Sequence, residues 1–246
     1  MYHFFADPQD ITDKDIYIKG GDFNHIKNVL RMKEGETVSV SDGISDREYR
    51  CHIEKYETDR VHLRLDFIKE AGVELPVRVY LFQCLPKADK MEFIIQKAVE
   101  LGVHGIIPVA SKRSVVKLDK KKAQAKCERW QKISESAAKQ SKRAEIPQVH
   151  EVMGFDEAVD YAKKLDRACI AYELEKGFDA TRKLIEGMRH DLSVGVFIGP
   201  EGGFDEAEIK RTEEAGFVSF SMGKRILRTE TAALVFLSWL VYSMEE

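Results

Sequence analysis

The stretch that decides the fold of this chain is residues 196–232, which begins with VFIGPEGGF (196–204) and ends with MGKRILRTETA (222–232). In both places glycines follow a short run, 193–198 and 217–222, that has the apolar or aromatic composition of a strand. Glycine tolerates positive φ and lets another group approach the backbone closely. The stretch therefore predicts two strands of one sheet, each followed by a turn suited to ligand contact.

The first glycine turn leads into a helix. Asp205 lies three residues before Glu208, the spacing of a capping box, and apolar residues at helical spacing follow. The turn thus lies between the carboxyl end of a strand and the amino end of a helix, where open α/β sheets bind ligands. The chain lacks the Gly-Lys-Ser/Thr of a P-loop here and the GxGxxG spacing of a dinucleotide site. Taken alone, this turn is equally explained as a plain strand-to-helix connection.

The second glycine turn is basic. Arg225 and Arg228 flank the apolar pair at 226–227, and Thr229 or Thr231 can cap a helix that runs to about residue 244. Glu230 suits the positive end of that helix. A loop with surface arginines is the simpler alternative. Two such turns after consecutive strands, one acidic and one basic, instead predict two walls of one pocket.

Composition and length limit the class of protein. The 246 residues, 43% of them hydrophobic, suit a globular protein of one large or two modest domains. No basic segment followed by an apolar core opens the chain, and the longest apolar run, 232–241, is shorter than the roughly 20 residues of a membrane helix. No cysteine pair has metal-ligand spacing. We therefore expect a cytoplasmic protein with reduced cysteines and no metal; the cysteines are Cys51, Cys84, Cys127 and Cys169.

Positive charge is concentrated in one segment although the net charge is −3. Residues 112–143 hold twelve Lys or Arg against three acidic residues, so the rest of the chain is strongly acidic. Such a concentration on an acidic protein is typical of phosphate contact, although a solvated helix face is the alternative. We favour RNA contact because arginines and Gln140 accompany the lysines.

The hydrophobic period divides the chain into two domains. Residues 1–70 contain short alternating strands at 16–18, 37–40, 47–53 and 60–65 and one helix at 22–30, a pattern typical of a small barrel. A polar connector at 69–76 follows. From residue 77 to 246, strands at 77–84, 103–109 and 167–172 alternate with helices at 89–101, 119–143, 155–165 and 179–187. This α/β alternation predicts a largely parallel sheet covered on both faces.

GPEGGF at 199–204 followed by LRTETA at 227–232 resembles the SPOUT superfamily, and more narrowly the ribosomal RNA small-subunit methyltransferase E family. HI at 25–26, VLR at 29–31, ELGV at 100–103, RSV at 113–115 and AAKQSKR at 137–143 extend the resemblance. It implies a PUA-like barrel over 1–70 and a SPOUT domain over 77–246, with a deep trefoil knot holding the cofactor site. It also implies a homodimer with the last helix at the interface, and S-adenosyl-L-methionine-dependent methylation of uridine N3 in 16S rRNA of the small ribosomal subunit.

The resemblance and the chemistry together assign candidate residues. Arg228 is the expected cation for the uracil anion, while Glu201 and Glu230 are the candidate bases. Two roles remain open: Glu201 as a cofactor acceptor and Glu230 as a helix cap. The expected cofactor contacts are Ile198, Gly199, Pro200, Glu201, Gly203, Met222, Gly223, Ile226, Leu227, Thr231 and Ala232. The expected RNA contacts are Arg31, Lys112, Arg113, Gln140 and Arg143. A non-enzymatic RNA-binding factor, or a methyltransferase of tRNA or of a ribose hydroxyl, are the alternatives.

Overall fold

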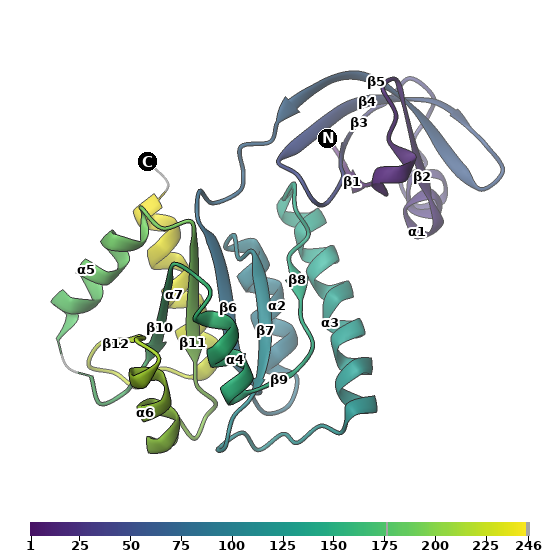
Figure 1. Ribbon diagram of the computed structural model, residues 1–246. Coiled ribbons are helices and arrows are strands. Elements are labelled where there is room, and N and C mark those ends of the chain that lie inside the picture. The colour runs from purple at the N-terminus through teal and green to yellow at the C-terminus, as the bar shows by residue number, and fades with distance from the viewer. Residues whose placement is uncertain (176, 245–246) are drawn as a thin grey trace. The chain divides into compact units, whose positions relative to one another are not determined.

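The computed structural model describes residues 1–175 and 177–244, so the predicted second domain, 77–246, includes three positions outside the described residues. The chain forms two compact units (Figure 1). The first unit is Met1–Glu74 together with Ala138–Ile146, and the second is Leu75–Ala137 together with Pro147–Glu246. The prediction from sequence had assigned residues 138–146 to the second domain.

The first unit is a curled sheet with the strand order β1-β3-β4-β5-β2. Its strands are β1 (His3–Phe5), β2 (Asp15–Lys19), β3 (Thr37–Ser41), β4 (Arg47–Tyr56) and β5 (Arg60–Glu70). Alternate residues such as Val38, Ile53 and Leu63 point inward and are fully buried. The predicted helix at 22–30 is split into α1 (Gly20–Asn24) and a π-helical turn, His25–Val29. The short strand β1 and the 3-10 turn Pro8–Asp10 were not predicted.

The second unit is built on a parallel sheet with the order β12-β10-β11-β6-β7-β8, with β9 beside β7. Its strands are β6 (Arg78–Cys84), β7 (Gly105–Ala110), β8 (Gln148–Val149), β9 (Met153–Gly154), β10 (Arg167–Ala171), β11 (Ser193–Ile198) and β12 (Val218–Phe220). Strands β10, β11 and β6 lie side by side in the sheet and carry nearly continuous apolar residues. This is the composition expected of parallel strands that are buried on both faces.

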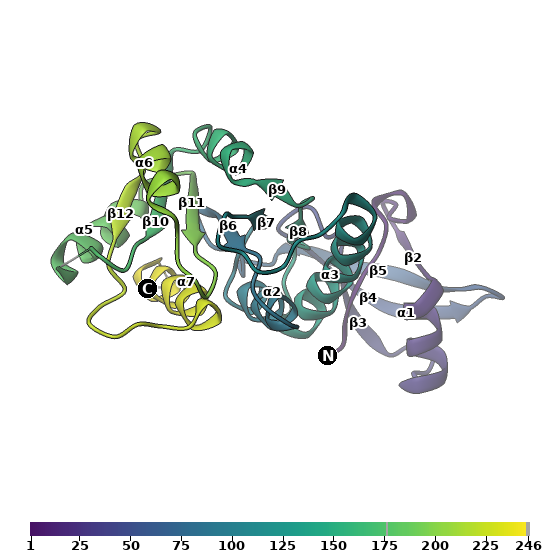
Figure 2. The ribbon, with the colours of Figure 1, turned by 90° about the horizontal axis from the view of Figure 1, so that it is seen from below.

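Helices cover both faces of the parallel sheet, as Figure 2 shows, which confirms the predicted α/β fold class. On one face α7 (Thr229–Met244) packs against α2 (Lys90–Glu100) and α5 (Phe178–Met188). On the other face lie α4 (Phe155–Ala162) and α6 (Glu206–Glu214). Beneath these two helices Phe82 and Phe197 stack with their ring centroids 4.4 Å apart. The capping box of α6 is present as predicted, with Asp205 and Glu208 as its two members. Within the described residues no helix combines the length and apolar character that crossing a bilayer requires.

The carboxyl ends of β10, β11 and β12 lie at one edge of the sheet because the three strands run parallel and β10 pairs with both of the others. β10 pairs with β11 on one side and with β12 on the other, and Ala171 at its end aligns with Phe220. The loops that leave these strands are therefore brought together at that edge, which is the ligand-binding edge of open α/β sheets.

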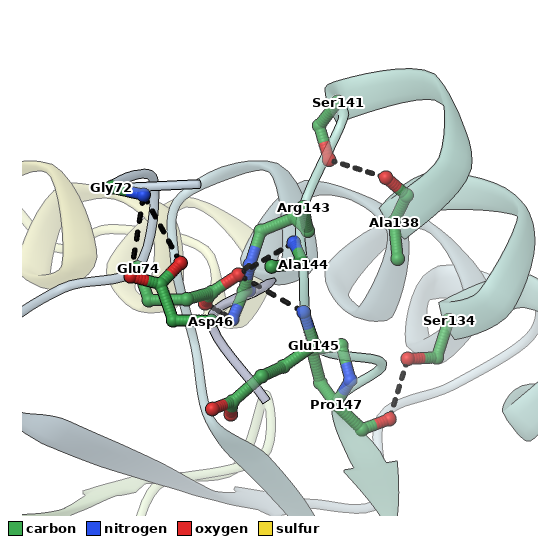
Figure 3. A network of polar contacts seen from close by, with 10 residues as sticks. All are labelled: Asp46, Gly72, Glu74, Ser134, Ala138, Ser141, Arg143, Ala144, Glu145 and Pro147. Atoms are coloured by element: carbon green, nitrogen blue, oxygen red, sulfur yellow. Dashed lines mark hydrogen bonds and ion pairs between the residues drawn. The ribbon is translucent and has the colours of Figure 1, made fainter. Parts of the chain in front are cut away.

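The long basic helix α3 (Lys120–Ser141) ends two residues earlier than predicted. Lys142 adopts φ 59°, and the N–H of Arg143 donates to the carbonyl of Ala138, the six-residue closure of a Schellman-type helix end. The chain then turns so that Arg143 faces Glu74 (Figure 3). The Glu74 carboxylate accepts from the Arg143 guanidinium and from the backbone N–H groups of Ala144 and Glu145 at 3.0 and 3.2 Å. We call this cluster the Glu74 junction.

Candidate active site

A cavity of about 320 Å³ lies in the second unit between the loops that follow β10, β11 and β12. Both glycine turns line it, so the predicted convergence of the two turns is present in the fold. Every residue predicted to contact the cofactor lines this cavity except Thr231, which is exposed and lies outside it. The loop after β10 adds a third wall, with Tyr172 and Glu173, that the sequence analysis had not included.

The first glycine turn is shaped by two different constraints. Gly203 has φ +67° and its N–H donates to the carbonyl of Pro200 at 3.0 Å, which closes the turn. Gly199 has an ordinary φ, but a Cβ there would lie 3.1 Å from the buried ring of Phe204. One glycine is therefore favoured by its conformation and the other by the tight contact with the Phe204 ring.

The second glycine turn leaves its backbone free to bind a ligand. In the part of the chain that the structure describes, the N–H and C=O groups of Met222 and Leu227 form no hydrogen bond with another residue. Ile226, in the same wall, is 89% exposed. Unpaired donors and acceptors beside an exposed apolar side chain fit the edge and the face of a heteroaromatic base. The residues present therefore fit an adenine-containing cofactor.

The charges around the cavity fall into a paired set and an unpaired set. Arg225, Arg228 and Glu173 all line the cavity, and within residues 1–175 and 177–244 none of them forms an ion pair. Glu201 is different, because its carboxylate accepts from the ammonium of Lys90 at 2.9 Å and from the N–H of Lys87 at 3.2 Å. A ligand that carries both charged and hydroxyl groups would find partners in the unpaired set.

Lys90 joins the two glutamates that the sequence analysis proposed as bases. Its Nζ lies 2.9 Å from Glu201 Oε1 and 3.1 Å from Glu230 Oε2. Burial acts to raise the pKa of Glu201, but hydrogen bonds from Lys90 and from backbone N–H groups outweigh it, so the pKa is lowered. The hydrogen bond to Glu201, followed by the ion-pair contact with Glu230, raises the pKa of Lys90. Glu201 is therefore held ionised and is a weakened proton acceptor.

Glu230 does not line the cavity, in contrast to the prediction that it belongs to the reacting pocket. It lies in the first turn of α7, where a carboxylate also suits the positive end of the helix. Its partner Lys90 opens α2, and no feature of the local sequence pattern marks that lysine. Lys90 was missed because its role depends on a contact between segments more than a hundred residues apart.

The loop after β7 carries two of the predicted RNA contacts and packs on the first glycine turn. Arg113 Nη1 donates to the carbonyl of Gly202 at 3.2 Å, and Lys112 Nζ lies 3.0 Å from Asp205 Oδ1. The N–H of Lys112 also donates to the buried carboxylate of Glu208 at 2.8 Å. Both basic side chains remain substantially exposed, so they lie beside the cavity and can still meet a phosphate.

The other three predicted RNA contacts belong to the first unit. Arg31 and Gln140 are exposed, and Arg31 has φ 52°, a conformation that is uncommon for a residue other than glycine. Arg143 is only 4% exposed. Its guanidinium is used by Glu74 in the Glu74 junction, so the structure does not present it as a surface cation. The sequence showed a basic run but could not show which member turns inward.

No group of three or more His, Cys, Asp or Glu side chains that could hold a metal ion occurs among the described residues. The cysteines are free thiols. Burial raises the pKa of Cys51 and of Cys84 to about 12, so both remain protonated at neutral pH.

The comparisons with known proteins agree with this architecture. A model described as RNA methyltransferase domain matches residues 73–241, and one described as RNA methyltransferase PUA domain matches residues 18–66. The chain is 40% identical over 233 residues to "Ribosomal RNA small subunit methyltransferase E" of Bacillus subtilis, covering 93% of this chain and 90% of that protein. It is 31% identical to the protein of the same name from Mycobacterium bovis, covering 95% and 88%.

A solved structure carries a ligand. The ribosomal RNA small subunit methyltransferase E of Neisseria gonorrhoeae, described as bound to S-adenosyl methionine, matches with a TM-score of 0.80 at 30% identity, covering 97% of this chain and 95% of that one. The fold and the matched domains define an RNA methyltransferase with a PUA domain. Within that class, the chain belongs to the ribosomal RNA small subunit methyltransferase E family.

Proposed function

We propose that this protein transfers a methyl group from S-adenosyl-L-methionine to N3 of a uridine in the 16S rRNA of the small ribosomal subunit. The observation that carries the proposal is the cavity at the strand ends, where an unbonded backbone segment lies beside the unpaired guanidinium of Arg228. Membership of the methyltransferase E family supports the choice of reaction.

We assign different parts of the cofactor to different residues of the cavity. We infer that the backbone groups of Met222 and Leu227 receive the adenine edge and that Ile226 packs against its face. The unpaired carboxylate of Glu173 suits hydroxyl groups of a ribose. S-adenosyl-L-methionine, when bound, supplies an electrophilic methyl group, so the protein's tasks are to bind, to orient and to make the nucleophile competent.

Uridine N3 carries a proton and becomes a competent nucleophile only when that proton is lost. We assign stabilisation of the resulting uracil anion to Arg228, because its guanidinium lines the cavity and is not neutralised by a carboxylate among the described residues. Glu201, with its lowered pKa and its bond to Lys90, is better suited to holding the first glycine turn than to accepting the proton.

RNA contact is proposed for several exposed donors. Arg31 and Gln140 in the first unit, and Lys112 and Arg113 beside the cavity, are exposed and can reach phosphate or base edges. Arg143 is left out because it is buried. N3 lies on the pairing edge of uracil, so the target uridine must be unpaired or flipped out of a helix to react.

We further propose a homodimer that uses α7, and a cytoplasmic location beside the ribosomal substrate. Tyr242 on α7 is 88% exposed, and Phe178 on α5 is 42% exposed while its ring packs edge-on against Trp239. Exposed aromatic residues of this kind favour a second copy as the covering partner. Light scattering of the purified protein measures the oligomeric state directly.

The product is tested by reading the RNA. A methyl on N3 blocks pairing with adenine, so reverse transcriptase should stall at the modified uridine in wild-type RNA and read through it in cells that lack the protein. Re-expression of wild-type protein should restore the stall, and the Gly203→Val variant should not. Mass spectrometry of digested nucleosides then separates a base methyl from a ribose methyl. A stall that persists in the deletion strain contradicts the uridine-N3 assignment.

A further inference from the structure

A buried hydrogen-bond chain connects the central strand β6 to both cavity turns. Gln83, in β6, is fully buried, and its Nε2 donates to the hydroxyl of Thr229 at 2.8 Å. The Thr229 hydroxyl donates in turn to the carbonyl of Gly199 at 2.6 Å. Thr229 follows the basic turn and Gly199 opens the glycine turn GPEGG, so one hydroxyl ties the two cavity walls together.

The donor-to-acceptor direction of this hydrogen-bond chain is determined by a second contact of the Gln83 amide. The same Nε2 of Gln83 lies 3.0 Å from the carbonyl oxygen of Cys84, which can only accept. The amide nitrogen must therefore point toward both Cys84 and Thr229. Because the Thr229 oxygen accepts a hydrogen bond from the Gln83 amide, its own O–H is left to donate to the carbonyl of Gly199. Gln83 thus occupies an acceptor position of the Thr229 hydroxyl and favours the orientation in which its proton points to Gly199.

A second buried threonine, Thr181, holds the backbone just after β12 through hydrogen bonds. The Thr181 hydroxyl donates to the carbonyl of Ser221 at 3.0 Å and accepts from its N–H at 3.2 Å. Ser221 lines the cavity directly before Met222, whose backbone is unbonded. The structure therefore secures the backbone next to the cavity through buried hydroxyls and leaves the neighbouring peptide groups free.

We propose that Thr229, oriented by Gln83, is a positioning residue that holds the Gly199–Pro200 turn in its ligand-binding conformation before the cofactor arrives. The proposal rests on the proposed function, since it names how that cavity is kept ready for S-adenosyl-L-methionine. A preformed turn avoids the free-energy cost of ordering a loop during binding. Loss of the hydroxyl leaves the Gly199 carbonyl without its donor and allows the turn to relax.

The test compares isosteric and conservative substitutions at Thr229. Thr229→Val keeps the shape and removes the hydroxyl, whereas Thr229→Ser keeps the hydroxyl. Calorimetry with S-adenosyl-L-methionine should give a Kd about tenfold higher for the valine variant, the size expected for one lost buried hydrogen bond, and a Kd near wild type for the serine variant.

Thr212→Val is the matched control. Like Thr229, Thr212 is buried and its hydroxyl donates to a carbonyl, that of Ile209 at 2.7 Å, but it does not line the cavity. Urea denaturation should show stability losses of similar size for Thr229→Val and Thr212→Val, while Kd rises only for Thr229→Val. A Kd that rises equally in both variants would show a merely structural effect and overturn the proposal.

Gln83→Met gives a second measurement that does not depend on the Thr229 variants folding. It removes the amide but leaves the Thr229 hydroxyl, so Kd should rise by a smaller factor, about threefold. An unchanged Kd in folded Thr229→Val, or in Gln83→Met where the former does not fold, overturns the proposal. Absence of binding to the wild-type protein would instead contradict the proposed function, so the two failures are distinguishable.

Discussion

The Glu74 junction and the cavity rim both concentrate charge and backbone polar groups, but they treat them in opposite ways. At the junction the carboxylate of Glu74 accepts hydrogen bonds from four donor atoms, two on the Arg143 guanidinium and two on the backbone. At the rim Arg225 and Arg228 lack a carboxylate partner in the described chain, and the peptide groups of Met222 remain unbonded. One region is saturated by the chain itself, and the other is incomplete without a ligand.

This difference separates a structural use of arginine from a functional one. A buried and fully bonded ion pair is costly to break, because removal of one member leaves the other charge buried and alone. An exposed and unpaired arginine costs little to remove from the fold, but it contributes wherever negative charge is bound or develops. Sequence composition makes Arg143 and Arg228 look alike, whereas their surroundings assign them different roles.

The largest expected effect is at the rim, in the Gly203→Val variant. Gly203 has φ +67°, which a β-branched residue adopts only with strain, so we expect the turn to change conformation and S-adenosyl-L-methionine binding to fall below detection. Gly216→Val is the control, since Gly216 has φ +83° but lies outside the cavity. Calorimetry measures binding and circular dichroism monitors the fold. Undiminished affinity in a folded Gly203→Val protein would remove the basis for this site.

The next effect tests the junction. Glu74→Gln removes the carboxylate charge that faces the buried guanidinium of Arg143, which should lower the free energy of unfolding by about 3–5 kcal/mol. Arg225→Gln at the rim should change it by less than about 0.5 kcal/mol. Urea denaturation of both variants gives the comparison directly. Equal losses in the two variants would contradict the distinction between saturated and incomplete regions.

Arg228→Ala should act on turnover rather than on stability. A cation needed only when uracil becomes anionic affects kcat, so we expect a fall of about 100-fold with little change in the Kd of S-adenosyl-L-methionine. Arg228→Lys, which keeps the charge, should recover part of the rate. A variant with normal kcat and weakened cofactor binding would reassign Arg228 to the cofactor.

Charge removal on α3 should give a moderate effect confined to RNA. Lys120, Lys121 and Lys132 are exposed, so replacing all three by alanine should weaken RNA binding and flatten its salt dependence. Each phosphate contact contributes roughly 0.7–0.9 to the slope of log K against log salt, so the loss of three contacts would reduce its magnitude by about 2–3. Filter binding over a salt series measures this slope, and an unchanged slope would make α3 a solvated face.

The smallest expected effect concerns acid stability at Glu201. Its folded-state pKa lies below the ordinary 4.5, so the unfolded chain takes up the proton first as pH falls. The stabilisation is therefore complete above pH 4.5 and is lost as pH drops through the folded pKa. When the pH is lowered from neutral to below the folded-state pKa, the free energy of unfolding should fall by about 0.2–1 kcal/mol more in wild type than in Glu201→Gln. This is the size of a partly exposed ion pair. If the free energies of unfolding of the two proteins fall equally as the pH is lowered, the pair with Lys90 contributes nothing to stability.

The parts of the fold predicted correctly are those whose signal is local. The strand at 193–198 and the capping box at Asp205 follow from residues within a few positions of each other, and both are present. The return of residues 138–146 to the first unit was missed because it depends on the pairing of Glu74 with Arg143, far apart in sequence. The two-residue strands β8 and β9 are too short to show any period. The trefoil knot stays a prediction from the resemblance.

The residues of the candidate site also divide into those with a local signal in the sequence and those without one. The glycine turns and Arg228 could be proposed from the sequence because they lie in segments that follow predicted strands, and the structure places them around one cavity. Glu173 follows the strand at 167–171 and could have been found by the same rule applied to a third strand. Lys90 and Gln83 have no such signal, because they act through contacts that only the folded chain brings about.

The exposure of Ile226 has a thermal consequence. At 89% exposure its apolar surface is hydrated in the cavity wall, and covering such surface on binding lowers the heat capacity. The enthalpy of cofactor binding should therefore become more negative with rising temperature, and replacement of Ile226 by serine should make that slope shallower. The temperature dependence of the binding enthalpy would in this way report how much of the exposed Ile226 side chain the ligand covers.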